Sequence, residues 1–192
     1  MKINQIQKSI VFLFVIVVFI SCKNETSQNA TTNTSTEAST LDKQGGQAFI
    51  EDDNSTPNVL QIAMKSPEHT TLVAAVKAAD LENVLVNAGP LMVFAPTNAA
   101  FEALPAGTVE DLLKPENKQK LAAILKHHVT AGNYDKDFLK KFKKLGQADD
   151  TNAILEVKGD DVYVGGAKII ASINAGNGIV HVVDKVILPP SN

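Results

Sequence analysis

A chain of 192 residues is long enough for one domain of ordinary size with residues to spare. Its 18 basic residues are all lysines and are outnumbered by 21 acidic residues, which gives a net charge of −3. Arginine, which reads phosphates and guanines with a bidentate fork, is absent, so the composition argues against specific nucleic-acid recognition.

The N-terminus has the pattern of a bacterial lipoprotein signal. Lys2 and Lys8 precede an apolar run at residues 10–20, which is too short to span a bilayer but suits a signal-peptide core. The run ends at Ser21 and Cys22, and a small residue before the single cysteine resembles a lipobox. Residues 1–21 are therefore predicted to be a lipoprotein-type signal peptide, with Cys22 as the lipidation site. The alternative is an ordinary secretory signal with a chance cysteine.

Residues 22–57 are predicted to form a flexible tether. They are rich in Ser, Thr, Asn and Gln and contain too few apolar residues to bury a core. A tether of this length has a root-mean-square span of roughly 30–35 Å. The domain is predicted to cover residues 58–190. It contains no cysteine, which excludes disulfides and thiol catalysis.

The first half of this domain has helical periodicity around one buried strand. Asn58 is expected to cap a short helix that ends at Ser66 and Pro67, and a second helix is expected from Thr70 or Thr71. Five apolar residues at 91–95 predict a strand buried on both faces, and Pro96 should end its pairing. Thr97 is then placed to cap a helix that packs through Phe101.

Two more helical segments follow. Thr108 and Asp111 nearly match a capping box that would open a helical turn at residues 109–113. Pro115 suits the first position of the next helix, and Gly132 is the expected stop. One face of that helix is apolar and carries Leu121, Ile124, Leu125 and His128.

The second half changes to strand patterns. Short β-rich runs at residues 153–157, 161–164 and 167–171 are separated by glycine turns. Asn177 and Gly178 turn the chain into the strongest predicted strand, residues 179–188. Because helices come first and strands later, the pattern indicates an α+β fold with N-terminal helices packed on a small β-sandwich or sheet formed by the central and C-terminal strands.

Residues 136–145 predict an amphipathic helix with a basic face. Apolar positions share one side, and Lys140, Lys141, Lys143 and Lys144 lie among the positively charged positions around it. One reading is attraction to anionic polysaccharide or lipid headgroups. The other is a docked helix with a solvated basic face.

Three stretches together resemble the fasciclin domain family. VFAPTNAAF, beginning at Val93, is similar to the first family signature, and NGIVHVVDKVILP, beginning at Asn177, to the second. His127, His128 and Val129 stand where the family usually has Tyr-His-Val. The resemblance covers residues 58–189. It implies a compact wedge of strands and helices in a protein that mediates adhesion at cell surfaces or in extracellular matrix.

The histidines do not predict a metal site. His127 and His128 are adjacent, so they would point about 100° apart on a helix, and no Cys or Glu stands at a ligand spacing beside them. Within the signature stretches Thr97, His128, Asn177 and His181 are expected to be structural residues. His128 and His181 are predicted to be hydrogen-bonded core histidines.

Animal relatives carry an Asp-Ile pair just before the second signature, and integrin binding is attributed to it. This chain has Ser172 and Ile173 there, so the carboxylate that would coordinate an integrin's metal ion is missing. That activity is not expected. Ser172, Ile173 and the four lysines at 140, 141, 143 and 144 remain the candidate interaction surface.

No enzyme is predicted. The chain has no Gly-x-Ser-x-Gly elbow, and its glycine pairs lack the context of a phosphate cradle. No catalytic residue, cofactor or nucleic-acid partner is expected. The predicted function is a lipid-anchored, outward-facing adhesion or interaction module of the cell envelope, with surface polymers, matrix or other cell-surface proteins as partners. The alternative is an envelope-located binding protein for a small apolar ligand.

Overall fold

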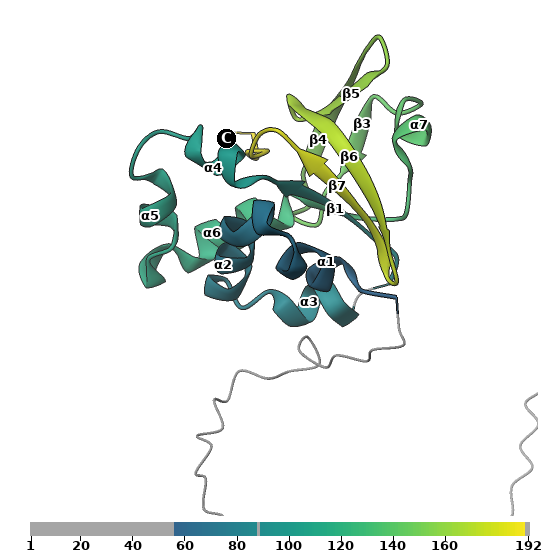
Figure 1. Cartoon of the computed structure of the whole chain (residues 1–192). Coiled ribbons are helices and arrows are strands. Elements are labelled where there is room, and N and C mark those ends of the chain that lie inside the picture. Colours follow the sequence, from purple (N-terminus) through teal and green to yellow (C-terminus); the bar gives the residue numbers. More distant parts are fainter. Residues whose placement is uncertain (1–55, 88, 191–192) are drawn as a thin grey trace, which may run out of the picture. The chain divides into compact units, whose positions relative to one another are not determined.

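The computed structural model describes residues 56–87 and 89–190 (Figure 1). The predicted signal peptide, Cys22 and all but the last two residues of the predicted tether lie outside the described residues. Within the described part, helices dominate the first half and strands the second, so the predicted α+β class is confirmed.

Side chains placed at helix starts explain several of the helices. Asn58 and Gln61 form a reciprocal capping box at the start of α1, and the Thr97 hydroxyl accepts from the amide of Ala100 at the start of α4. The helices, with η denoting a 3₁₀-helix, are α1 (Val59–Lys65), η2 (Pro67–His69), α2 (Thr70–Ala78), α3 (Glu82–Asn87), α4 (Asn98–Glu102), α5 (Thr108–Leu112), η3 (Pro115–Asn117), α6 (Lys118–Lys126) and α7 (Lys136–Leu139).

Two expected helix boundaries are wrong. The residue before α5 is Gly107 in the left-handed conformation (φ 83°), with no side-chain cap, so Thr108 does not open a capping box. The helix predicted to run to Gly132 ends at Lys126, because the chain turns at His127 and His128 into a short strand. Sheet pairing at that strand outweighs the local helical pattern.

The strands form one sheet of mixed direction. They are β1 (Leu91–Pro96), β2 (Val129–Ala131), β3 (Lys144–Gly146), β4 (Asn152–Lys158), β5 (Asp161–Val164), β6 (Ala167–Ala175) and β7 (Gly178–Val183). Their order is β2-β1-β7-β6-β5-β4-β3, and β1 and β7 are parallel while the other neighbours are antiparallel.

The two ends of this sheet approach each other. The amide of Ala148 donates to the carbonyl oxygen of Val129 at 2.7 Å, and the Thr130 hydroxyl donates to Gln147 Oε1 at 2.8 Å. The sheet therefore curls toward a barrel. Of the two arrangements expected from the sequence, a sandwich or a sheet, the structure has a single sheet.

The helix predicted at residues 136–145 is also wrong in extent. Asp135 caps a single turn, α7, and the chain then enters β3, where Leu145 pairs with Ala153 of β4. This path buries both Leu139 and Leu145 in the same core. Similarly, β7 ends at Val183 rather than Leu188, because Asp184 turns to bond with the backbone of Lys168.

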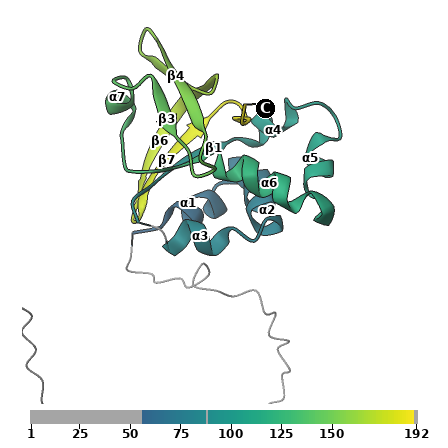
Figure 2. The ribbon, with the colours of Figure 1, turned by 180° about the vertical axis from the view of Figure 1, so that it is seen from behind.

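Strand β1 separates two hydrophobic cores. Leu91, Val93 and Ala95 pack with the helices, whereas Met92 and Phe94 pack with the C-terminal strands. Figures 1 and 2 show the corresponding layers, with α1, α2, α3 and α6 on one side of β1 and β3, β4 and β5 on the other. Every residue of β1 and of β7 is buried, as expected for a parallel pair covered on both faces.

The β1–β7 pair depends on a glycine at its first position. Gly178 pairs with Leu91, and a Cβ at Gly178 would overlap the Leu91 carbonyl oxygen and press on its amide nitrogen. Both of these neighbours are backbone atoms and cannot rotate away. The pair therefore has room only for glycine at this position.

We expect Gly178→Ala to lower the free energy of unfolding by roughly 3 kcal/mol, because the added methyl must displace β1. Urea unfolding followed by far-UV circular dichroism measures this, since the chain has no tryptophan to report by fluorescence. Gly89→Ala is the matched control, because nothing lies within 4 Å of a Cβ there, and it should stay within about 0.5 kcal/mol of the parent. Equal effects of the two substitutions would contradict this role of Gly178.

Candidate interaction surface

The outer edge of β6 is open along most of its length. β6 pairs with β7 from Ile169 to Ala175, but β5 pairs with it only at Ala167 and Lys168. Among residues 56–87 and 89–190, no strand pairs with the other edge of residues 170–175. Residues 170–174 are exposed and uncharged, and the side chains of Ile170 and Ile173 are 52% and 41% exposed.

Ser172 is bound to a buried histidine behind this edge. His181 Nε2 lies 2.9 Å from the carbonyl oxygen of Tyr134, so it must be the ring's donor, and Nδ1 then accepts from the Ser172 hydroxyl at 2.8 Å. Burial lowers the pKa of His181, which favours this neutral form. Phe94 stacks on the ring with 5.6 Å between centroids.

The lysine-rich segment, residues 136–145, directly follows the part of the chain that bonds to His181 through the Tyr134 carbonyl oxygen. The rings of Tyr134, Phe138 and Phe142 contact one another with centroids 5.2–5.5 Å apart. Lys140 pairs with Asp137 at 2.8 Å, and the Lys141 ammonium lies 4.8 Å from the Phe138 ring centroid. Lys143 and Lys144 are exposed. The two parts of the predicted surface are thus linked through Ser172, His181 and Tyr134.

The sequence prediction missed Ile170 and Tyr134. Ile169 and Ile170 are both isoleucine, so the residue types alone do not show which of the two faces the core; in the structure Ile169 is buried and Ile170 is exposed. Tyr134 contributes a backbone oxygen to His181, and a backbone contact of this kind leaves no signal in the residue type.

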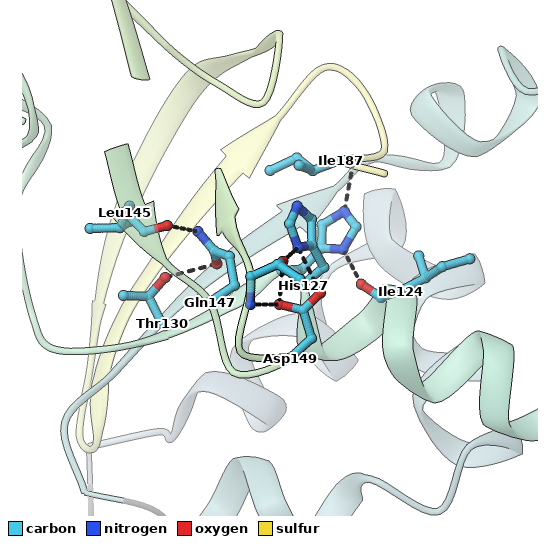
Figure 3. A network of polar contacts seen from close by, with 9 residues as sticks. Ile124, His127, Thr130, Leu145, Gln147, Asp149 and Ile187 are labelled. Atoms are coloured by element: carbon cyan, nitrogen blue, oxygen red, sulfur yellow. Dashed lines mark hydrogen bonds and ion pairs between the residues drawn. The ribbon is translucent and has the colours of Figure 1, made fainter. Parts of the chain in front are cut away.

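His127 lies in a buried polar network at the end of α6 (Figure 3). Its Nδ1 is 2.9 Å from Asp149 Oδ2 and 2.7 Å from the Thr151 hydroxyl, which itself donates to Asp149. Burial raises the pKa of Asp149, but hydrogen bonds from Thr151 and His127 outweigh it and hold the pKa below its usual value. His127 thus ties the end of α6 to the loop between β3 and β4.

His128 and Asn177 join distant segments. His128 Nδ1 donates to the carbonyl oxygen of Ile124 at 2.8 Å, and Nε2 accepts from the amide of Ile187 at 2.9 Å (Figure 3). Asn177 accepts from the amide of Val59 at 2.9 Å and donates to the Leu85 carbonyl at 2.7 Å, which holds α1 and α3 to the turn before β7. His128 thus links α6 to the C-terminal segment, and Asn177 links α1 and α3 to β7.

An apolar groove, which the sequence did not predict, lies between the helices and the C-terminal segment. It encloses about 270 Å³ and is bordered by α2, the end of β1, α4, α5, α6 and residues 186 and 188. The sequence shows which residues are apolar, but it does not show which apolar faces leave space between them. A second, smaller cavity of about 60 Å³ is bordered by α1, α2, α3, the end of α6 and the strands β1, β2 and β7.

In the described part of the chain no cluster of three or more His, Cys, Asp or Glu side chains is placed to hold a metal ion. No helix in the same residues is both long and apolar enough to cross a bilayer.

The sequence and the fold are both similar to those of known proteins. The profile of the Fasciclin domain matches residues 67–189. Protein sll1483 of Synechocystis is 46% identical over 138 residues, covering 71% of this chain and 76% of that protein. The cell surface glycolipoprotein MPB83 of Mycobacterium bovis is 34% identical over 138 residues, covering 69% and 61%.

Solved structures share the fold. One example is a pair of FAS1 domains from the insect cell adhesion molecule fasciclin I, with a TM-score of 0.60 and 18% sequence identity. The match covers 69% of this chain and 51% of the other, so this chain spans about half of that domain pair.

The geometry of His128 predicts a pH dependence of stability. Burial lowers its pKa from 6.5 to about 4, so the unfolded chain binds more protons between these values. The contribution of neutral His128 to the free energy of unfolding is therefore complete above about pH 6.5 and is lost as the pH falls toward 4. For this histidine alone the loss is roughly 3 kcal/mol. Burial also lowers the pKa values of His69 and His181, which act in the same direction.

Urea unfolding between pH 7 and pH 4 checks this prediction. The free energy of unfolding should fall as the pH is lowered through that range. His128→Gln should be less stable at pH 7 but should lose less stability on acidification, because it lacks the histidine that takes up a proton on unfolding. A parent protein of constant stability, or a variant with an unchanged pH dependence, would contradict the assignment.

Proposed function

This chain belongs to the fasciclin domain family, and from that premise we propose that it is a non-enzymatic interaction module that binds surface polymers, matrix or other cell-surface proteins. The observation that supports this proposal best is the open, uncharged edge of β6. A solved structure with the same fold comes from a cell adhesion molecule, and this supports adhesion as the proposed class of function.

The backbone along the open edge of β6 can form hydrogen bonds with an added strand. In an antiparallel ladder alternate residues direct both N–H and C=O away from the paired strand, so about three residues within 170–175 present unpaired groups. Natural sheet edges are commonly protected by lysine or proline, and residues 170–175 contain neither. An extended partner segment can therefore add a strand there, with Ile170 and Ile173 supplying apolar contacts.

The lysines near this edge would act at longer range. Lys143 and Lys144 are exposed, and Lys140 and Lys141 are held in place by Asp137 and the Phe138 ring. A local positive patch on a chain of net charge −3 would attract anionic polymers and guide the encounter. We therefore include Lys140, Lys141, Lys143 and Lys144 with Ser172 and Ile173 in the proposed interaction surface.

We further propose that the domain, residues 58–190, is lipid-anchored at Cys22 after removal of residues 1–21 and displayed outward on the tether of residues 22–57. The similarity to a protein named as a cell surface glycolipoprotein supports this arrangement. Many copies anchored in one membrane raise the effective concentration, so adhesion does not require a high affinity for each copy.

A second candidate function is binding of a small apolar ligand. The groove of about 270 Å³ between helices and C-terminal segment favours it, because its wall is almost entirely apolar. The β6 edge takes no part in this groove, so the two functions can be tested separately.

The test of the proposed function uses beads coated with the chain from residue 23 and cells of the producing organism. Ile173→Lys and Ile170→Lys place a charge on the open edge, and we expect each to reduce bead adhesion roughly tenfold, which corresponds to about 1.4 kcal/mol. Met64→Lys in α1 is the matched control, since this methionine is also exposed, at 39%, and belongs to neither the β6 edge nor the lysine-rich segment.

Adhesion by the Met64→Lys beads should equal that of the parent. An equal loss in all three variants would assign the effect to added charge rather than to the β6 edge, and unchanged adhesion by the two β6 variants would remove this edge from the proposal. Circular dichroism of each variant shows that the fold is intact.

A further inference from the structure

The apolar groove has one charged side chain on its wall. Of the residues that border it, Lys120 in α6 carries a charge, and Thr108 and His128 are polar. His128 has both ring nitrogens engaged by Ile124 and Ile187, and burial lowers its pKa to about 4, so it presents a neutral ring. The groove thus combines apolar walls with a single cation.

Among the described residues Lys120 forms no ion pair within 4 Å, although its charge contributes to lowering the pKa of Asp111. The two other lysines at this end of α6 are paired, Lys114 with Asp111 at 2.9 Å and Lys118 with Asp80. Lys120 itself is exposed and borders the groove. Its ammonium is therefore available to an anionic group of a ligand.

Local backbone features lie on both sides of the groove. Gly107, in the left-handed conformation, turns the chain into α5, and Phe101 and Leu104 before it and Thr108 after it border the groove. On the opposite side the C-terminal end lies beside α4 (Figures 1 and 2), where Ile187 is held by His128 and Leu188 remains half exposed. The turn at Gly107 and the hydrogen bond between Ile187 and His128 thus help to position the two sides of the groove.

The size of the groove limits the ligand. A volume of about 270 Å³ lies just below the usual range of roughly 300–1,000 Å³ for small-molecule sites, so a single hydrocarbon chain fits better than a fused ring system or a two-chain lipid. Such a chain would cover Leu104 and Leu188, which otherwise leave apolar surface in contact with water.

We propose that this groove binds a free fatty acid of medium chain length, with the hydrocarbon chain against Phe101, Leu104 and Leu121 and the carboxylate at Lys120. The proposal gives a ligand class to the second candidate function and rests on it. It is independent of the adhesion surface on β6.

The test compares two ligands that differ only in the head group. Decanoate and decanol are titrated into the chain from residue 23 by calorimetry at about pH 8, where the acid is ionised. Both should bind, and decanoate should bind about fivefold more tightly because only it can pair with the lysine. Lys120→Gln should raise the Kd of decanoate to that of decanol and leave decanol unchanged.

Two further variants keep the test specific. Lys126→Gln removes the same charge from α6 at a position that does not border the groove, and it should leave both Kd values unchanged. Leu104→Trp fills the groove and should abolish binding of both ligands, with circular dichroism showing that the variant is folded.

The outcomes separate the two claims. If neither ligand binds the parent protein, both the fatty-acid proposal and the second candidate function fail. If both ligands bind equally, or if Lys126→Gln acts like Lys120→Gln, the apolar site stands and the assignment of a carboxylate to Lys120 fails. Binding that survives in folded Leu104→Trp would place the ligand outside the groove and overturn the proposal.

Discussion

The parallel pairing of β1 with β7 is the constraint on which the rest of the domain depends. Residues 91–96 lie beside residues 178–183 with both strands buried throughout, and the contact requires glycine at position 178. β1 gives one face to the helices and the other to the C-terminal strands, so a shift of this strand would disturb both cores. Asn177, directly before β7, extends the same constraint to α1 and α3.

Both proposed binding regions arise where elements extend beyond this central pair. β6 follows β7 to Ala175, whereas β5 ends earlier, which leaves the edge that carries Ser172 and Ile173. The groove forms on the helical side, where Gly107 turns the chain into α5 and His128 holds the C-terminal segment in place. The stable centre thus positions two different surfaces, one suited to an extended partner and one to an apolar ligand.

The sequence predicted features that depend on neighbouring residues. The caps at Asn58 and Thr97 follow from a side chain and an amide three residues away, and the buried strand follows from an unbroken apolar run. It did not predict β3, because the lysine-rich segment has helical spacing and its strand forms only by pairing with β4. Of the interaction surface, it indicated Ser172 and the lysines, but their link through His181 and the backbone of Tyr134 required the fold.

The central claim is that this domain faces outward, where it can reach a partner. Protease treatment of intact cells, compared with cells that carry Cys22→Ala, tests it most directly, because location decides which partners are possible. The account predicts that protease releases the wild-type domain from whole cells by cutting in the tether, and that the Cys22→Ala form is not retained at the cell surface. A wild-type domain that stays protected until the outer barrier is opened would contradict adhesion and leave ligand binding within the envelope as the function to pursue.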